Sequence, residues 1–335
     1  MVLKNMTAPK ILCKEKGSCQ TGIDARGRPL PSLPPIVMLA DHRRPAPRLV
    51  HQPTGSRMLK SQRLATLPID SYDLAEDLSV IDSNDAGGEY DAFSFGYWSA
   101  HVLANSGGNG KDTAFRPYEG QLTLTDLGRK LPGIMSLVTD NFPLDRLQWV
   151  RVFGLSDGIL APHVDFLEFS EPGTRLQIPL RTDEDSLHSE NDIVYHLRRG
   201  EVWKIHTTVP HSARSVSPLA RLSLCLDFAD AETPIDIKNS IPSELPVRII
   251  SRPPVSEADL AELMDSAADM NAGNLRASFR KFAAVHFTRQ ADATAAFDWF
   301  VEAAVRTGDD ALVTKAEAFR RYCIEKRGYR EAFDW

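Results

Sequence analysis

Short apolar stretches recur at close spacing between residues 61 and 230, and they limit the fold of this 335-residue chain more than any other feature. Each is four to twelve residues long, is rich in Val, Ile, Leu, Phe or Trp, and ends at Gly, Pro, Asp or Ser. Such stretches are typical of β-strands, and many of them at this spacing indicate a double-sheet jelly roll or barrel. We therefore predict a fold that is mainly β with α, built on a double-stranded β-helix, the jelly roll of cupin-like proteins. The expected strands are 147–153, 158–169, 174–180, 193–197, 201–205 and 222–228, with a helix at 131–139.

The pattern changes from strand to helix after residue 254. Ser256 precedes Glu257 and Asp259, and a serine followed by acidic residues is typical of a helix N-terminus. We therefore expect a jelly-roll domain over 58–250 and a small helical domain over 251–335. Further helices are expected at 275–287, 291–306 and 311–326.

The first 57 residues differ in composition from the rest. They hold eight prolines and almost no periodic apolar pattern, so they are predicted to be a disordered extension. Residues 1–60 carry eleven Lys and Arg against three Asp and Glu, a net charge of +8. Because the net charge of the whole chain is −6, residues 61–335 carry −14. The basic stretch suits nucleic acid or anionic lipid, but we interpret it as a solvated extension, and Met58 is a candidate for the true start. The acidic main body argues against a nucleic-acid substrate.

Composition also bears on location. The longest apolar runs are far shorter than the roughly 18 residues that span a bilayer, and no apolar segment with a cleavage site opens the chain. The four cysteines, at positions 13, 19, 225 and 323, form no CxxC pair, and Cys13 with Cys19 would make a poor metal site. We therefore predict a cytoplasmic protein without a membrane segment.

One short motif points to chemistry. His163 and Asp165 are two residues apart, so on a strand both side chains project from the same face, with Val164 turned away. An imidazole and a carboxylate on one face are two members of the 2-His-1-carboxylate triad that holds Fe(II) and leaves positions open. The third ligand must come from a distant strand, and His211 is the best candidate. A lone His-x-Asp is weak support, because a buried hydrogen-bonded His–Asp pair is the more common explanation.

A fourth residue strengthens the hypothesis. Arg221 lies ten residues beyond His211 and just before an apolar run, where a jelly roll would place its guanidinium near the open metal positions. The planar guanidinium can bind the distal carboxylate of 2-oxoglutarate through two hydrogen bonds. The alternative is that Arg221 pairs with a surface acid. His206 is a rival third ligand, ranked below His211 because Arg221 is in register with the latter.

Several further segments resemble the bacterial L-proline 3-hydroxylase family, which belongs to the aspartyl/asparaginyl hydroxylase-like oxygenases. The similarity covers most of the chain, reaches back to Met58 and extends into the helical C-terminus. The matching segments are 90–98 (YDAFSFGYW), 162–166 (PHVDF), 188–192 (HSEND), 200–203 (GEVW), 211–213 (HSA), 221–227 (RLSLCLD), 285–287 (VHF) and 308–310 (GDD).

The resemblance implies an enzyme, a 2-oxoglutarate-dependent dioxygenase. It implies Fe(II) held by His163, Asp165 and His211, 2-oxoglutarate held by Arg221 and lying near His188, and O2 as the oxidant. Because Asp165 supplies the carboxylate ligand, a halide cannot easily replace it, so halogenation is disfavoured.

The resemblance also implies residues that bind the substrate. Arg175 matches a strand arginine that binds a carboxylate of substrate or cosubstrate, and Arg151 has a similar position on the preceding strand. Glu168 and the acidic run 183–185 are candidates for cationic groups, although such a run is more often a solvated loop. An arginine on a strand is also often a purely structural partner, and His188 can simply cap a turn.

The expected reaction is hydroxylation of an unactivated C–H bond of a free L-amino acid, either proline-like or basic, such as lysine. A basic side chain would need a buried acid in the pocket, which the sequence does not locate. Two alternatives remain open: a hydroxylase of carrier-bound or peptidyl residues, and a non-oxygenase cupin-type metal protein. A carrier protein or a second copy of the chain are open as partners. A role in making building blocks of natural products is an expectation from the family.

Overall fold

The computed structural model describes residues 58–84, 92–111, 121–165, 173–243, 245–325 and 331–335. All of them belong to one compact unit, Thr54–Trp335. The predicted extension 1–57 and the predicted substrate residue Glu168 lie outside the described residues, and the division into separate domains stays a prediction.

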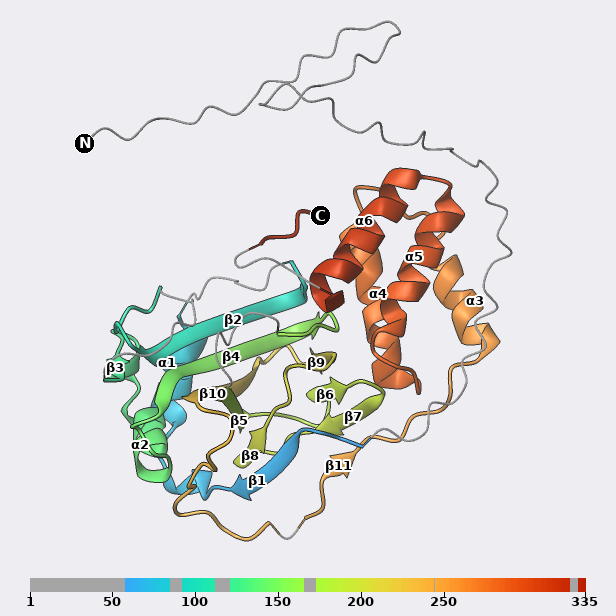
Figure 1. The fold of residues 1–335 in the computed structure, drawn as a ribbon. Helices are drawn as coiled ribbons and strands as arrows, with labels where there is room; N and C mark the ends of the chain where they lie inside the picture. Colours follow the sequence, from blue (N-terminus) through green and yellow to red (C-terminus); the bar gives the residue numbers. More distant parts are fainter. Residues whose placement is uncertain (1–57, 85–91, 112–120, 166–172, 244, 326–330) are drawn as a thin grey trace, which may run out of the picture. The chain divides into compact units, whose positions relative to one another are not determined.

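The described strands form one curled sheet (Figure 1) in the order β1-β8-β5-β10-β4-β9-β6-β7-β11, with β2 beside β4 and β3 beside β2. Strand β4 makes the curl, because it pairs with β10 and β2 along most of its length and with β9 near its end. The strands are β1 Gln62–Thr66, β2 Ser94–Asn105, β3 Thr123–Leu124, β4 Leu147–Leu160, β5 Gly173–Arg181, β6 Leu187–Glu190, β7 Ile193–His196, β8 Glu201–Lys204, β9 His211–Ser215, β10 Arg221–Ala229 and β11 Arg248–Ile249.

Two helices, α1 and α2, lie between strands in the sequence, whereas α3 to α6 follow the longer strands and pack at one end of the sheet (Figure 1). The helix predicted after Ser256 begins there with a capping box, in which the Ser256 hydroxyl and the Asp259 carboxylate bond each other's backbone N–H groups. The helices are α1 Ala75–Asp82, α2 Pro132–Asn141, α3 Glu257–Asp265, α4 Leu275–Thr288, α5 Ala295–Thr307 and α6 Asp310–Arg320. The predicted fold class, mainly β with a jelly-roll core followed by helices, is confirmed.

Two main cores hold these layers together. One lies between the sheet and the helices α1 and α2, and is lined by apolar side chains of β4, β5, β10 and α2. The other joins α3 to α6 to the sheet, since the helical side chains pack on Phe95 of β2 and Ile159 of β4. The backbone N–H of Val164 also donates to the carbonyl oxygen of Cys323, directly after α6, at 3.0 Å. The helices therefore support the sheet where β4 ends.

Two predicted strands differ from the structure. The sequence indicates separate strands over 147–153 and 158–169, whereas β4 runs unbroken from Leu147 to Leu160. Among the described residues 161–165 only an isolated bridge follows, at His163, and 166–169 lie outside the described residues. Pro162 has no N–H to contribute to a ladder, which explains the end of β4. Strands β1, β2, β6 and β9 were not predicted, because their polar residues interrupt the apolar pattern, and β3 and β11 were not predicted because they are only two residues long.

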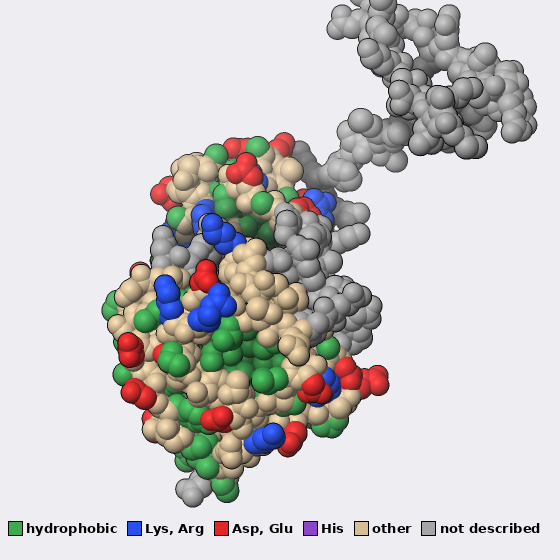
Figure 2. All heavy atoms as spheres, turned by 90° about the vertical axis from the view of Figure 1, so that its left-hand side faces the viewer, with side chains coloured by type: hydrophobic (Ala, Val, Ile, Leu, Met, Phe, Trp, Pro, Cys, Tyr) green, Lys and Arg blue, Asp and Glu red, His purple; other side chains and the backbone are tan. Residues whose placement is uncertain are grey.

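One face of this unit is shown in Figure 2, where apolar side chains gather in the middle of the lower part and charged side chains of both signs lie around them. Such mixed surfaces are ordinary for folded proteins, of which much of the surface is apolar. No helix in the described part of the chain is long and apolar enough to cross a membrane.

The second core predicts a large effect of one substitution. Phe279 of α4 is fully buried, and the ring centroids of Phe95 and Phe319 lie 5.5 and 4.9 Å from its own. We expect Phe279→Ala to lower the free energy of unfolding by about 3–5 kcal/mol, because it leaves a cavity among these rings. Urea unfolding followed by circular dichroism measures the change. Val305→Ala on α5, at a side chain that is 58% exposed, is the control and should change it by under about 0.5 kcal/mol. Equal midpoints for the two variants would contradict this description of the core.

Candidate metal centre

Backbone pairing between distant parts of the chain brings two histidines together. His163 follows β4 and His211 opens β9, and each donates its backbone N–H to the carbonyl oxygen of the other, at 2.9 and 3.0 Å. Residues paired in this way face each other across an antiparallel ladder. Their imidazole centroids lie 4.3 Å apart.

The two imidazoles are oriented in the same manner. Nδ1 of His163 lies 2.8 Å from the carbonyl oxygen of Ala161, and Nδ1 of His211 lies 3.0 Å from that of Val209. A carbonyl oxygen only accepts, so we assign the proton to each Nδ1, which leaves a lone pair on each Nε2. Histidines that ligate metals are commonly held by such a bond from the other ring nitrogen. The sequence did not name these two carbonyl groups.

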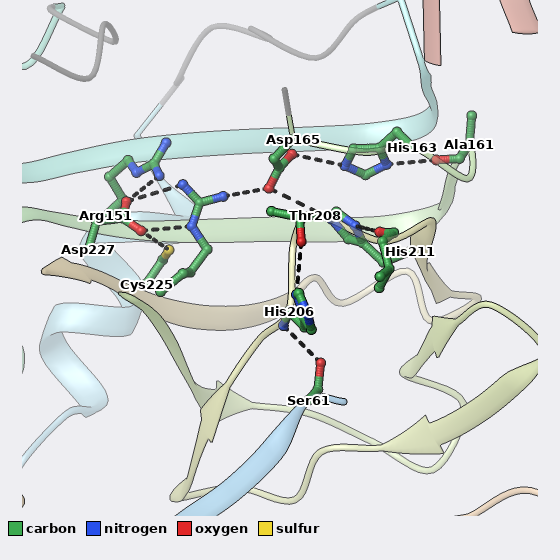
Figure 3. A network of polar contacts seen from close by, with 12 residues as sticks. Ser61, Arg151, Ala161, His163, Asp165, His206, Thr208, His211, Cys225 and Asp227 are labelled. Carbon is green, nitrogen blue, oxygen red and sulfur yellow. Dashed lines mark hydrogen bonds and ion pairs between the residues drawn. The ribbon is translucent and has the colours of Figure 1, made fainter. Parts of the chain in front are cut away.

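The Asp165 carboxylate lies beside the two rings and faces both of them (Figure 3). Its Oδ1 is 3.6 Å from Nε2 of His163, and its Oδ2 is 3.8 Å from Nε2 of His211. The candidate ligand atoms all lie within 4.8 Å of one another. Bonds of about 2.1 Å to a metal ion keep neighbouring ligand atoms about 3 to 4 Å apart. The donor set and its spacing therefore fit one ion held by two histidines and a carboxylate.

Behind Asp165 lies a buried cluster of charges. Arg175 donates from Nη1 to Oδ2 of Asp165 at 2.9 Å and from Nε to Oδ1 of Asp227 at 2.7 Å. Arg151 donates to Oδ2 of the same Asp227 at 2.6 Å, and its guanidinium lies 3.5 Å from the ring centroid of Trp149. The two arginines thus face two carboxylates, and their charges balance. Arg175 lines the pocket beside the triad, whereas Arg151 lies beneath it and is only 1% exposed.

Asp227 is a site residue to which the sequence analysis gave no role. Its side chain is fully buried. Strand alternation in the sequence could have indicated this role. Asp227 is six residues after Arg221 on β10, and residues an even number apart on a strand lie on the same face.

Arg221 has a different environment from the other two arginines. It opens β10, lines the pocket and is 7% exposed. Within the described residues, no carboxylate lies within ion-pair distance of it and no hydrogen bond engages its guanidinium. Burial lowers the pKa of Arg221 to about 10, so the group stays positively charged near neutral pH. A buried cation without a partner is costly unless an anion binds it, which fits an anionic ligand.

His188 on β6 lines the same pocket, as predicted from the resemblance. Burial lowers the pKa of this histidine well below its usual value, and the charge of Arg221 lowers it further. His188 is therefore neutral near pH 7 and does not compete with Arg221 for an anion. Its ring centroid lies 5.9 Å from that of Tyr195.

The pocket is lined by both apolar and polar side chains. Phe93, Trp98, Phe153, Leu160 and Ala213 are apolar, and Arg175, Gln177, His188 and Arg221 are polar or charged. Asp165 is the only acid among the described lining residues. The pocket can therefore receive a ligand that is partly apolar and partly anionic.

His206, the rival third ligand, does not join the triad. Its Nδ1 lies 3.1 Å from the hydroxyl of Thr208, and its backbone N–H donates to the hydroxyl of Ser61 at 3.0 Å (Figure 3). The group of candidate ligand atoms contains His211 instead. The acidic run 183–185 is exposed and is absent from the described lining of the pocket.

The bond from Arg175 to Asp165 predicts an effect on metal affinity. We expect Arg175→Met to weaken binding of Mn(II) by about 10- to 100-fold, because the carboxylate loses the group that orients it. Calorimetric titration with Mn(II) measures the affinity. Arg181→Met is the matched control on the same strand: Arg181 bonds Asp82 at 2.8 and 2.6 Å, away from the triad, so the affinity should not change. Unchanged affinity in the Arg175 variant would show that Asp165 does not depend on this bond.

Two family models match this chain in succession. The model described as aspartyl/asparaginyl beta-hydroxylase matches residues 70–231, and the model described as L-proline 3-hydroxylase, C-terminal, matches residues 232–331. Together the two matches cover strands β2 to β11 and helices α1 to α6, and among the described strands only β1 precedes them.

Characterised relatives agree with the two models. An L-proline cis-4-hydroxylase of Rhizobium meliloti (strain 1021) is 28% identical over 80% of this chain and 96% of its own length. L-proline cis-3-hydroxylase 2 of a Streptomyces species is 29% identical over 82% of this chain and 98% of its own length. A solved oxidoreductase of the 2OG-Fe(II) oxygenase family from Burkholderia pseudomallei covers 50% of this chain and 84% of its own at 13% identity, with a TM-score of 0.31, a likeness too distant to carry weight. From residue 70 to residue 331 the chain is therefore similar to the aspartyl/asparaginyl beta-hydroxylases and the L-proline hydroxylases, as expected of a 2-oxoglutarate-dependent dioxygenase.

Proposed function

We propose that this protein hydroxylates a free, proline-like L-amino acid in an Fe(II)- and 2-oxoglutarate-dependent reaction. The observation that carries the proposal is the pairing of the His163–Asp165–His211 triad with Arg221, a buried cation that has no acidic partner among the described residues. The relatives, which are named as proline hydroxylases, support the same reaction.

The metal and the cosubstrate fit the residues present. His163, Asp165 and His211 would hold Fe(II), and Arg221 would bind a carboxylate of 2-oxoglutarate through its planar guanidinium. When bound with O2, the iron and 2-oxoglutarate supply the oxidising power for the reaction, and 2-oxoglutarate leaves as succinate and CO2. The protein's own contribution is to orient these groups, and neutral His188 leaves Arg221 as the positive group beside them.

A proline-like substrate suits the pocket better than a basic one. Trp98, Phe153 and Leu160 offer an apolar surface on which an aliphatic ring can pack and from which water is excluded. A lysine side chain would bring a second ammonium group, and Asp165 is the only acid in the described lining, where Arg175 already bonds it. Arg175 is the arginine that we propose for the substrate carboxylate, since it lines the pocket and Arg151 does not.

We further propose that the reaction takes place in the cytoplasm. Cys225 and Cys323 are buried thiols, which suits a reducing compartment. A carrier protein, a second copy of the chain and a place in natural-product synthesis stay predictions.

The proposal is tested by supplying Fe(II), 2-oxoglutarate and O2 with L-proline, L-pipecolate or L-lysine. We expect a product about 16 Da heavier than the amino acid, the mass of one inserted oxygen atom, together with succinate. The cyclic amino acids should react and lysine should not. Mass spectrometry detects the product, and an enzymatic assay detects succinate.

Matched variants assign the reaction to the triad. Asp165→Ala should remove both products, because the ion loses its anionic ligand, and His206→Ala should retain them, because His206 lies outside the triad. Succinate without a heavier amino acid would redirect the search to carrier-bound or peptidyl substrates. No succinate from iron-loaded wild-type protein would overturn the oxygenase and leave a cupin-type metal protein.

A further inference from the structure

The pocket contains a buried amide oxygen without a partner. Gln177 lies in the middle of β5, and its side chain lines the pocket. Its Oε1 is buried and has no hydrogen-bond partner in the described part of the chain. Buried polar atoms are rarely left unsatisfied, because the loss of hydration is not recovered. An unsatisfied acceptor that faces a ligand pocket therefore points to a donor on the ligand.

The neighbours of Gln177 explain why the protein itself supplies no donor. Its partner across β10 is Cys225, which belongs to the apolar cluster with Trp98 and Phe153. Its partner across β8 is Trp203, whose indole N–H donates to Glu201 at 2.9 Å. Neither of these two cross-strand partners therefore offers Gln177 a free N–H group.

The two ligands of the proposed reaction differ in what they can donate. 2-Oxoglutarate carries two carboxylates and a ketone, all of which only accept hydrogen bonds. A zwitterionic amino acid carries an ammonium or, in proline, a secondary ammonium, which donates. The acceptor of Gln177 therefore matches the substrate and not the cosubstrate.

The position of Gln177 also suits an α-amino acid. Residues two apart on a strand project from the same face about 7 Å apart, so Gln177 is the next side chain along from Arg175 on the pocket side. An α-amino acid carries its carboxylate and its amino group on one carbon, so the side chains that bind them must be close neighbours. The adjacent guanidinium and amide oxygen meet this requirement.

We propose that Oε1 of Gln177 accepts a hydrogen bond from the α-ammonium group of the substrate and thereby selects α-amino acids. This inference rests on the proposed function, since it names the residue that recognises the substrate of that reaction. Gln177 is a binding residue in this proposal and takes no part in the chemical step.

Two substitutions separate the acceptor from the donor of the amide. Gln177→Met keeps the length of the side chain and removes both, whereas Gln177→Glu keeps an acceptor and removes the donor. We expect the Met variant to bind L-proline at least about tenfold more weakly and the Glu variant to bind it within about threefold of wild type. Both should bind 2-oxoglutarate as wild type does. Anaerobic calorimetric titration of the Mn(II)-loaded protein, with and without 2-oxoglutarate, measures the two affinities without turnover.

Gln148 provides a matched control. It lies on β4, and its Oε1 is also buried without a partner in the described residues, but it does not line the pocket. Gln148→Met should leave both affinities unchanged, with a thermal melting curve that reports any general loss of stability.

A substrate analogue tests the hydrogen bond itself. (S)-Tetrahydrofuran-2-carboxylate replaces the ring nitrogen of L-proline with oxygen and has no N–H group. Wild-type protein should prefer proline strongly, and the preference should shrink about tenfold in the Met variant. An undiminished preference, equal loss in the Glu and Met variants, or a loss of 2-oxoglutarate affinity would each overturn the role of Gln177 while the proposed reaction stands. Failure of wild-type protein to bind any free amino acid would overturn both.

Discussion

The reciprocal backbone hydrogen bonds between His163 and His211 are the constraint on which the site depends. They join the chain just beyond β4 to the start of β9, two segments 48 residues apart in sequence, and so set both imidazoles on one face. Each ring then bonds a carbonyl two residues upstream in its own segment, and the Asp165 carboxylate faces Nε2 of both rings. The ligand geometry is thus built from main-chain pairing, which resists distortion better than side-chain packing alone because each bond is fixed by its strand.

Charge balance divides the arginines of the pocket into two kinds. Arg151 and Arg175 face Asp165 and Asp227, so this buried cluster is neutral as a whole and orients the carboxylate of the triad. Arg221 is outside the cluster and keeps its positive charge for a ligand. Of the two arginines in the cluster only Arg175 lines the pocket, so only Arg175 is also placed to meet a ligand.

Much of the fold and the members of the triad could be predicted from the sequence, because they follow from local patterns. The apolar runs of β4, β5 and β10 indicated strands, and the two-residue spacing of His163 and Asp165 indicated a shared face. The role of Asp227 and the unsatisfied oxygen of Gln177 could not be predicted, since both depend on which side chains neighbouring strands place beside them. The end of β4 at Leu160 was not predicted. Apolar residues lie on both sides of Pro162, and the prediction gave them more weight than the backbone N–H that proline lacks.

The hydrogen bond from Val164 to the carbonyl of Cys323 has a consequence for how the chain responds to its ligands. It ties the segment that holds two of the three candidate ligands to the end of α6, and the core behind it includes Ile159 and Ala161 next to that segment. A ligand that binds only the folded state raises the free energy of unfolding of every part that unfolds together with its site. The helices at the far end of the sequence therefore share in the stabilisation by a bound ion, and an ion-free chain would be weakened along its whole C-terminal half.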